Sequence, residues 1–218
     1  MIERRAVVTI SAKAYQKMMA FVKACPTECQ WHFVAHRQPT KNRAGKYYYK
    51  IDDVLVYKQY CSGGATTTDD FEYNKWLFLD VEPDTPIFGH GHSHVDMPAY
   101  RSVRDAAYQA GEIKSLSKGQ FFIFLIVNKR GGIHCTVYDN VLKQLFSNEQ
   151  NNVELVCNGR NAYKKSDLDR FVQNALSLVY PMSDYPNHEK IDLSSLEEME
   201  GEDEEGDEED ISSEIIQQ

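Results

Sequence analysis

The chain has 218 residues, of which 42% are hydrophobic, and a formal net charge of -9. This length fits one globular domain with an appendage and excludes two full-sized domains. The acidity is local, because residues 197–210 carry 11 carboxylates and no basic side chain, whereas the rest has 24 basic and 22 acidic residues. No basic stripe stands out, so we expect no nucleic acid as a partner.

The compartment is predicted from three features. The chain has no apolar run that approaches the roughly 20 residues of a membrane helix, and its N-terminus lacks the apolar core of a signal peptide. The five cysteines are an odd number without the framework of a small secreted domain. We therefore expect a cytoplasmic protein with reduced thiols and no membrane partner.

The N-terminal part of the chain predicts a strand, a helix and a second strand. Residues 6–10 are apolar and typical of a strand, and Ser11 can cap a helix that ends before Pro26. Residues 28–37 then alternate between apolar and polar side chains, which predicts a half-buried strand with Glu28 at its entry.

The middle of the chain predicts alternating strands and helices. Aromatic and β-branched residues favour strands, and Asp69 or Asp70 can cap a helix. The glycine pair at 131–132 predicts a hairpin turn. The expected elements are a long or kinked strand at 47–60, a loop at 61–70, helices at 71–79 and 102–111, and strands at 121–128 and 133–138.

The C-terminal part has a different composition. Residues 166–179 have the apolar spacing of an amphipathic helix that ends before Pro181. Residues from about 183 onward are polar and then almost purely acidic, a composition that favours disorder. We expect a domain at 1–158, an accessory helix at 159–182 and an acidic tail at 183–218, which would either dock on a basic partner, inhibit the domain, or serve only solubility.

The segment 87–105 holds the candidate metal site. His90, His92 and His94 alternate with small residues, so an extended backbone directs all three imidazoles to one face. Ser102 and Asp105 are three positions apart, which makes them neighbours on a helix. Two imidazoles and one carboxylate are a usual ligand set for catalytic zinc, so the segment predicts a zinc site formed by two of the three histidines together with Asp105.

The spacing His92-x-His94-x7-Ser102-x2-Asp105 resembles the JAMM (MPN-plus, JAB domain) motif of zinc metalloproteases at every signature position and interval. The resemblance covers roughly residues 6–138, and Glu28 stands where that family has its upstream glutamate. It departs from the family at Val95, where a proline is usual, and at Gln30-Trp31, where a glycine is usual.

The resemblance implies an α/β (α+β) fold, a curved mixed sheet flanked by helices, with zinc at the end of the His-bearing strand. It implies that Glu28 is the general base, that Ser102 hydrogen-bonds the oxyanion, and that the substrates are proteins or peptides, ubiquitin-like conjugates among them. The prokaryotic or viral type of the family fits better than a proteasome-lid subunit. The resemblance also implies that the zinc ligands are His92, His94 and Asp105, which makes His90 a neighbour of the ligands and not one of them.

Two other functions compete with a zinc metallopeptidase. The first is a JAMM-fold assembly or binding subunit without turnover, in which the C-terminal helix and the acidic tail contact partners. The second is a metallo-β-lactamase-like hydrolase, because His92-Ser93-His94-Val95-Asp96 reproduces most of a His-x-His-x-Asp-His signature. Met97 occupies the position of the last His, and this substitution disfavours the second alternative.

Overall fold

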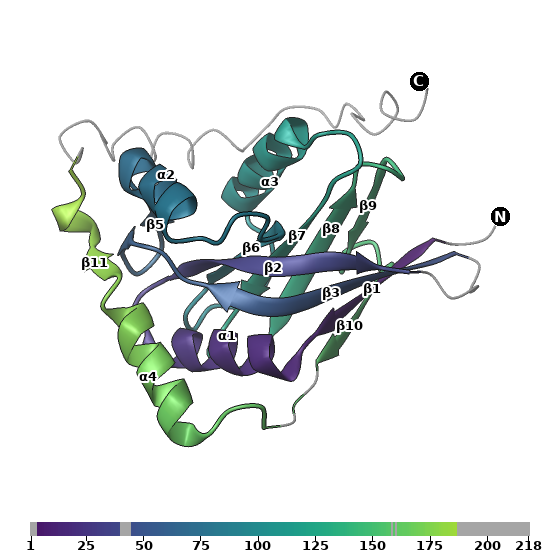
Figure 1. The fold of residues 1–218 in the computed structure, drawn as a ribbon. Helices are drawn as coiled ribbons and strands as arrows, with labels where there is room; N and C mark the ends of the chain where they lie inside the picture. The colour runs from purple at the N-terminus through teal and green to yellow at the C-terminus, as the bar shows by residue number, and fades with distance from the viewer. Residues whose placement is uncertain (1–3, 40–44, 158, 160, 187–218) are drawn as a thin grey trace, which may run out of the picture. The chain divides into compact units, whose positions relative to one another are not determined.

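The computed structural model describes residues 4–39, 45–157, 159 and 161–186. Within this part of the chain, four α-helices accompany a curved, nearly closed mixed sheet (Figure 1). The helices are α1 (Ala12–Ala24), α2 (Asp70–Leu79), α3 (Val103–Ser115) and α4 (Lys165–Leu176), and a 3-10 turn, η1, spans Met182–Asp184.

The main sheet has eight strands and a mixed topology. They are β1 (Arg5–Ile10), β2 (Gln30–Gln38), β3 (Lys46–Leu55), β6 (Ile87–Ser93), β7 (Phe121–Val127), β8 (Ile133–Asp139), β9 (Gln144–Ser147) and β10 (Val153–Cys157). Their order is β10-β1-β3-β2-β6-β7-β8-β9. β1 runs parallel to both of its neighbours and β6 runs parallel to β7, whereas the other pairs are antiparallel. The His-bearing strand β6 is therefore central.

A small second sheet lies beside the main one. It contains β4 (Gln59–Cys61), β5 (Thr66–Thr67) and β11 (Val179–Pro181), in the order β11-β4-β5. Tyr185, beyond β11, packs edge-on against Tyr60 of β4 with ring centroids 5.2 Å apart. The end of the described chain is thus joined to the segment that follows β3.

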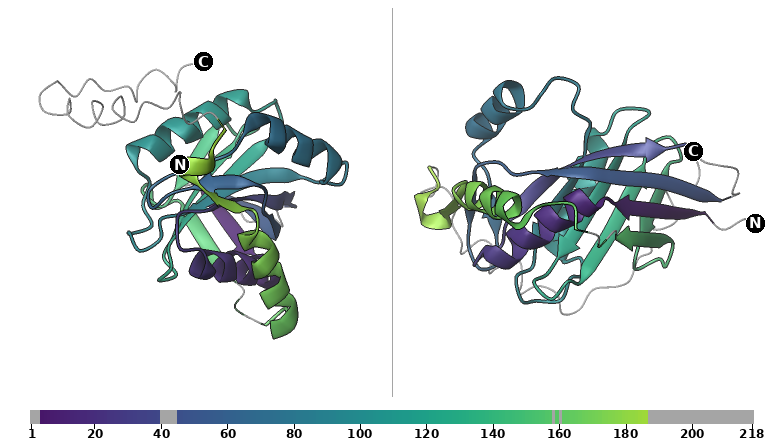
Figure 2. Two further views of the ribbon diagram at one scale, coloured as in Figure 1. Left: turned by 90° about the vertical axis from the view of Figure 1, so that its left-hand side faces the viewer. Right: turned by 60° about the horizontal axis from the view of Figure 1, so that its bottom comes forward.

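The two faces of the main sheet are covered by different helices, as Figures 1 and 2 show. On one face, Trp31 and Phe33 of β2 are fully buried and join the core that includes Phe21 of α1. On the other face, His32 of β2 contacts the aromatic side chains of α2. The alternation along β2 therefore separates an apolar core from a polar and aromatic layer under α2 and α3.

Helix α1 is built as its sequence predicts. The Ser11 hydroxyl accepts a hydrogen bond from the backbone N–H of Ala14 and caps the helix. Helix α4 packs along α1, where Lys17 lies over the ring of Phe171 at 5.0 Å. Gln16 of α1 also accepts the backbone N–H groups of Ala162 and Tyr163, which lead into α4.

Several expected elements differ from the structure in their bounds. The strand expected at 28–37 begins at Gln30, and the strand expected at 47–60 is divided into β3 and β4. The loop expected at 61–70 contains β5, and the helix expected to reach residue 179 ends at Leu176. Three strands were not predicted, namely β9, β10 and β11.

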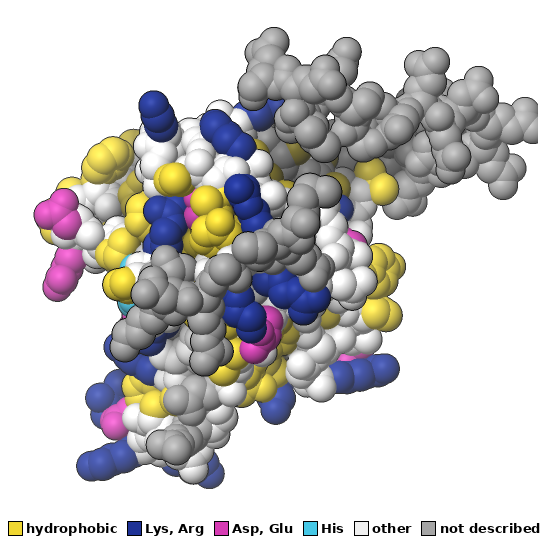
Figure 3. All heavy atoms as spheres, turned by 90° about the vertical axis from the view of Figure 1, so that its right-hand side faces the viewer, with side chains coloured by type: hydrophobic (Ala, Val, Ile, Leu, Met, Phe, Trp, Pro, Cys, Tyr) yellow, Lys and Arg dark blue, Asp and Glu magenta, His cyan; other side chains and the backbone are white. Residues whose placement is uncertain are grey.

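The surface and the C-terminal region complete the description. Figure 3 shows Lys and Arg side chains spread over one face among apolar and uncharged ones. No helix in the described ranges is long and apolar enough to span a membrane. The turn η1 crosses from the range 159–182, which we assigned to an accessory helix, into the range 183–218, which we assigned to the acidic tail. From residue 187 onward, the tail lies outside the described residues.

Candidate metal centre

The strand β6 carries histidines on one side and glycines on the other. His90 and His92 pair with His32 and Gln30 of β2, respectively, so their side chains share the face that α3 covers. A Cβ atom at Gly91 would lie 2.5 Å from Nε1 of Trp31, which occupies the opposite face. The Gly-His alternation therefore lets a bulky core side chain pack directly against the backbone of the ligand-bearing strand.

His94 follows the end of β6 and is fixed by the loop after it. Its ring atom Nδ1 lies 3.2 Å from the carbonyl oxygen of Pro98, so Nδ1–H donates to this oxygen. In the neutral ring, this hydrogen bond leaves the lone pair of Nε2 available for a metal. Val95, the residue directly after His94, has a φ of 41°, a left-handed conformation that is costly for a β-branched residue and impossible for proline.

The third ligand is placed by the start of α3. The Ser102 hydroxyl accepts the backbone N–H of Asp105 at 3.2 Å, and Oδ2 of Asp105 accepts the backbone N–H of Ser102 at 2.9 Å. This reciprocal pair is a capping box. The Ser102 hydroxyl also donates to Oδ2 of Asp105 at 2.7 Å, so the cap orients the carboxylate.

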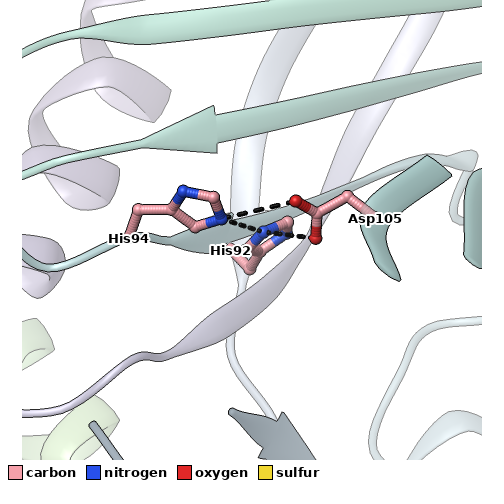
Figure 4. A group of neighbouring side chains, drawn as sticks. All are labelled: His92, His94 and Asp105. Carbon is pink, nitrogen blue, oxygen red and sulfur yellow. Dashed lines mark hydrogen bonds and ion pairs between the residues drawn. The ribbon is translucent and has the colours of Figure 1, made fainter. Parts of the chain in front are cut away.

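The two imidazoles and the carboxylate converge at one point (Figure 4). Nε2 of His92 lies 3.1 Å from Nε2 of His94 and 3.1 Å from Oδ1 of Asp105. Nε2 of His94 lies 3.4 Å from Oδ2 of Asp105. In the described part of the chain, these three residues are the group of potential ligands whose donor atoms lie within 4.8 Å of one another.

The donor atoms fit a tetrahedral metal ion. Zinc bonds of about 2.0 to 2.2 Å at tetrahedral angles place neighbouring ligand atoms roughly 3.3 Å apart. The separations among His92, His94 and Asp105 match this value. Two nitrogen ligands and one oxygen ligand form a donor set that divalent zinc accepts, with one position remaining for a water molecule.

The charges of the cluster stabilise one another. Burial opposes ionisation of Asp105, but the hydrogen bonds from His92 and His94 outweigh it and hold the pKa of Asp105 well below its usual range. The hydrogen bond to Asp105 raises the pKa of His94, although burial acts against it. Asp105 is therefore an anion at neutral pH, as a metal ligand must be.

Glu28 lies just before β2, close enough to the cluster for electrostatic interaction with its side chains. Only 6% of its surface is exposed. Burial raises the pKa of Glu28, and the positive charges of His92 and His94 act in the opposite direction. Glu28 is thus a buried carboxyl group with a raised pKa beside the candidate metal site.

His90 lies beside the converging group and belongs to an aromatic layer. Its Nε2 lies 3.2 Å from Oε1 of Gln30, and its ring contacts those of His32 and Tyr108. The buried His32 is held in one tautomer, because Nδ1 donates to the carbonyl oxygen of Gly89 while Nε2 accepts from the hydroxyl of Tyr73. This layer separates the cluster from the region under α2.

The structure brings His92, His94, Asp105 and Ser102 together and places Glu28 and His90 beside them. The side chains of Ser93 and Gln59, which were not predicted from the sequence, hold the backbone around Glu28. The position of Ser93 between two predicted ligands was a usable signal, whereas the sequence around Gln59 offered none. No protein-family model matches the chain, and no curated protein sequence is significantly similar to it.

Proposed function

We propose that the protein is a zinc-dependent metallopeptidase that hydrolyses a peptide or isopeptide bond. The observation that carries the proposal is the convergence of His92, His94 and Asp105 with donor atoms 3.1 to 3.4 Å apart. Zinc held by these ligands would polarise a substrate carbonyl and lower the pKa of a bound water molecule to roughly 7.

Glu28 supplies the proton transfer in this proposal. Its carboxylate accepts the proton of the attacking water and returns it to the leaving amine, so that the amide bond breaks without expelling an amide anion. Burial raises the pKa of Glu28, which makes its carboxylate a stronger base toward the attacking water.

Ser102 has two tasks in the proposal. Its hydroxyl caps α3 and donates to Asp105, which keeps the carboxylate turned toward the histidines. On substrate binding, we infer that the same hydroxyl turns to donate a hydrogen bond to the developing oxyanion.

We further propose that the fold is of the JAMM type. The curved mixed sheet with helices on both faces, and the ligands at the end of a central strand, support this assignment. Val95 departs from the family in conformation as well as in identity, because its φ of 41° excludes the usual proline. The loop 95–101 is therefore where we expect the substrate preference to differ from that of other members.

The second candidate function is a protein-binding subunit without turnover. Its support comes from α2, whose outward side chains Phe71, Phe78 and Leu79 are each more than 70% exposed. Exposed apolar side chains on one helix often mark a protein contact. The two candidates differ in activity, which the next experiment measures.

The test is zinc content together with hydrolysis of a panel of ubiquitin-like conjugates and short peptides. We expect one zinc per chain, and Glu28→Gln should keep the zinc but lower turnover about 100-fold or more. Glu154→Gln, at an exposed salt bridge with Lys46, is the matched control and should leave turnover unchanged. A chain without stoichiometric zinc, or a fully active Glu28→Gln variant, would contradict the proposal.

A further inference from the structure

The backbone around Glu28 is held by three different partners on three successive N–H groups. The N–H of Glu28 donates to the carbonyl oxygen of Ser62 at 3.0 Å. The N–H of Cys29 donates to Oγ of Ser93 at 2.9 Å, and the N–H of Gln30 donates to Oε1 of Gln59 at 2.7 Å. Two of these three acceptors are side chains.

Side chains are needed here because the sheet does not extend this far. The ladder between β2 and β6 begins with the pair Gln30 and His92, so Glu28 and Cys29 precede it. All three residues from 28 to 30 are nonetheless buried. A buried N–H without a partner is strongly unfavourable, so an ordered segment at this depth requires acceptors from outside the ladder.

Ser93 joins the Glu28 segment to the ligand strand itself. It lies between His92 and His94, and strand alternation directs its side chain away from the metal cluster. Besides accepting the N–H of Cys29, Ser93 donates its own N–H to the carbonyl oxygen of Cys29 at 2.8 Å. Ser93 is only 1% exposed, so water does not compete for these two hydrogen bonds. Together they hold the segment before β2 in a fixed register with the strand β6.

Gln59 acts in place of a neighbouring strand on the other side. Its side-chain amide accepts the N–H of Gln30 through Oε1 and donates to the carbonyl oxygen of Gln30 through Nε2 at 2.9 Å. Nε2 also donates to the carbonyl oxygen of Tyr57, and the whole side chain is inaccessible to solvent. Gln59 thus fixes the residue where β2 begins.

From this arrangement we infer that Ser93 and Gln59 are positioning residues for Glu28. The inference rests on the proposed function, in which Glu28 transfers the proton. Ser93 sets the distance between the Glu28 segment and the strand β6. Gln59 prevents the start of β2 from shifting along β6. Neither side chain touches the reacting atoms, so each acts through the placement of Glu28.

The first test compares Ser93→Ala and Gln59→Met with the wild-type chain. We expect each to retain one zinc and to lower kcat by about tenfold, with KM changed less than about twofold, because a misplaced base slows the reaction more than it weakens binding. Ser93→Thr keeps the hydroxyl and should restore most of the kcat. The control is Ser147→Ala, which removes a buried hydroxyl that also accepts a backbone N–H but lies on β9.

The deciding measurement is a double-mutant cycle with Glu28→Gln. If Ser93 and Gln59 act through Glu28, Ser93→Ala and Gln59→Met should have little effect on the residual kcat of Glu28→Gln. The same fold loss on both backgrounds would overturn the inference, because it would show a general structural effect.

A second readout separates this inference from the proposed function. Amide hydrogen exchange of residues 28–30 should accelerate at least about tenfold in Ser93→Ala and Gln59→Met, and not in Ser147→Ala, since each loses a hydrogen bond that protects this segment. If the wild-type chain shows no peptidase activity, the proposed function fails, and the exchange rates alone decide whether the two side chains hold the segment. Unchanged exchange in both variants would overturn the inference whatever the activity.

Discussion

Two residue types alternate along β6, and different forces determine them. The histidines form the pattern from which we predicted the metal site, and strand alternation alone places them on one face. The glycines follow from the neighbouring strand, because Trp31 and Phe33 of β2 fill the space where a Cβ at Gly91 or Gly89 would lie. The histidine pattern was predictable from the sequence, whereas the reason for the glycines required the pairing of β2 with β6.

The steric role of Gly91 predicts a specific loss of stability. Gly91→Ala should lower the free energy of unfolding by about 1 to 3 kcal/mol, because the new methyl group forces Trp31 out of its position. Gly64→Ala, where the Cβ meets nothing within 4 Å, is the matched control. Urea unfolding of both variants measures the difference, and equal stabilities would show that Trp31 adapts without cost.

The capping role of Ser102 and its proposed catalytic role can be measured separately. Ser102→Ala should lower the free energy of unfolding by about 1 kcal/mol through loss of the cap, and lower kcat by about 100-fold through loss of the oxyanion donor. Zinc content should not change, since the three ligands remain. A variant with reduced stability and normal kcat would leave Ser102 with the capping role alone.

At the scale of elements, α2 is attached to β2 by an aromatic layer rather than by an aliphatic core. None of its residues is fully buried, and its side chains Tyr73 and Trp76 pack against His32 and Tyr57. Burial lowers the pKa of His32 to about 4, and the hydrogen bond to the carbonyl oxygen of Gly89 only partly offsets this. The neutral ring is therefore part of how α2 is held.

This burial predicts a loss of stability in mild acid. Between pH 6.5 and about 4 the unfolded chain binds a proton at His32 that the folded chain does not bind, so lowering the pH through this window favours unfolding, and His32 contributes roughly 3 kcal/mol to this loss. Chemical denaturation at pH 7.5, 6, 5 and 4 measures it. His32→Gln should be less stable than the wild-type chain at pH 7.5 but should lose less stability on acidification, and an equal loss in both chains would contradict the prediction.

How much of the fold was predictable depended on how local its causes are. The strand at 6–10, the Ser11-capped helix and the buried strand at 121–127 follow from local periodicity and capping. β10 was missed because all five of its residues are exposed or only partly buried, and it is defined by parallel pairing with β1 far away in the sequence. The candidate site divides in the same way, since three ligands lie in one short segment, whereas Gln59 meets Gln30 only after β4 has folded beside β2.

At the scale of the whole molecule, the candidate metal site connects the central strand to the helix that covers it. His92 and His94 come from the end of β6, and Asp105 from the first turn of α3. An ion bound between them would couple the sheet to α3 across the loop 95–102, so metal binding and the stability of the domain are linked.

This linkage predicts stabilisation by zinc. Free zinc at 100 times its dissociation constant should raise the free energy of unfolding by about 2.7 kcal/mol, provided that the unfolded chain does not bind it. The melting temperature should rise by roughly 5 to 10 °C and fall again when a chelator is added. Asp105→Asn should lose this stabilisation by zinc, and Glu28→Gln should keep it. An equal stabilisation of the wild-type protein and both variants would show that zinc binds elsewhere.

The placement of the four residues in the sequence has a consequence for how active protein is made. The three ligands lie between positions 92 and 105, whereas Glu28 reaches them only after β2 has paired with β6. Short loops close faster than long ones, so we expect a refolding chain to assemble the proposed ligand set before Glu28, the proposed base, reaches it. Zinc should then be captured ahead of the return of activity, and a preparation fully loaded with metal can still contain molecules that do not turn over.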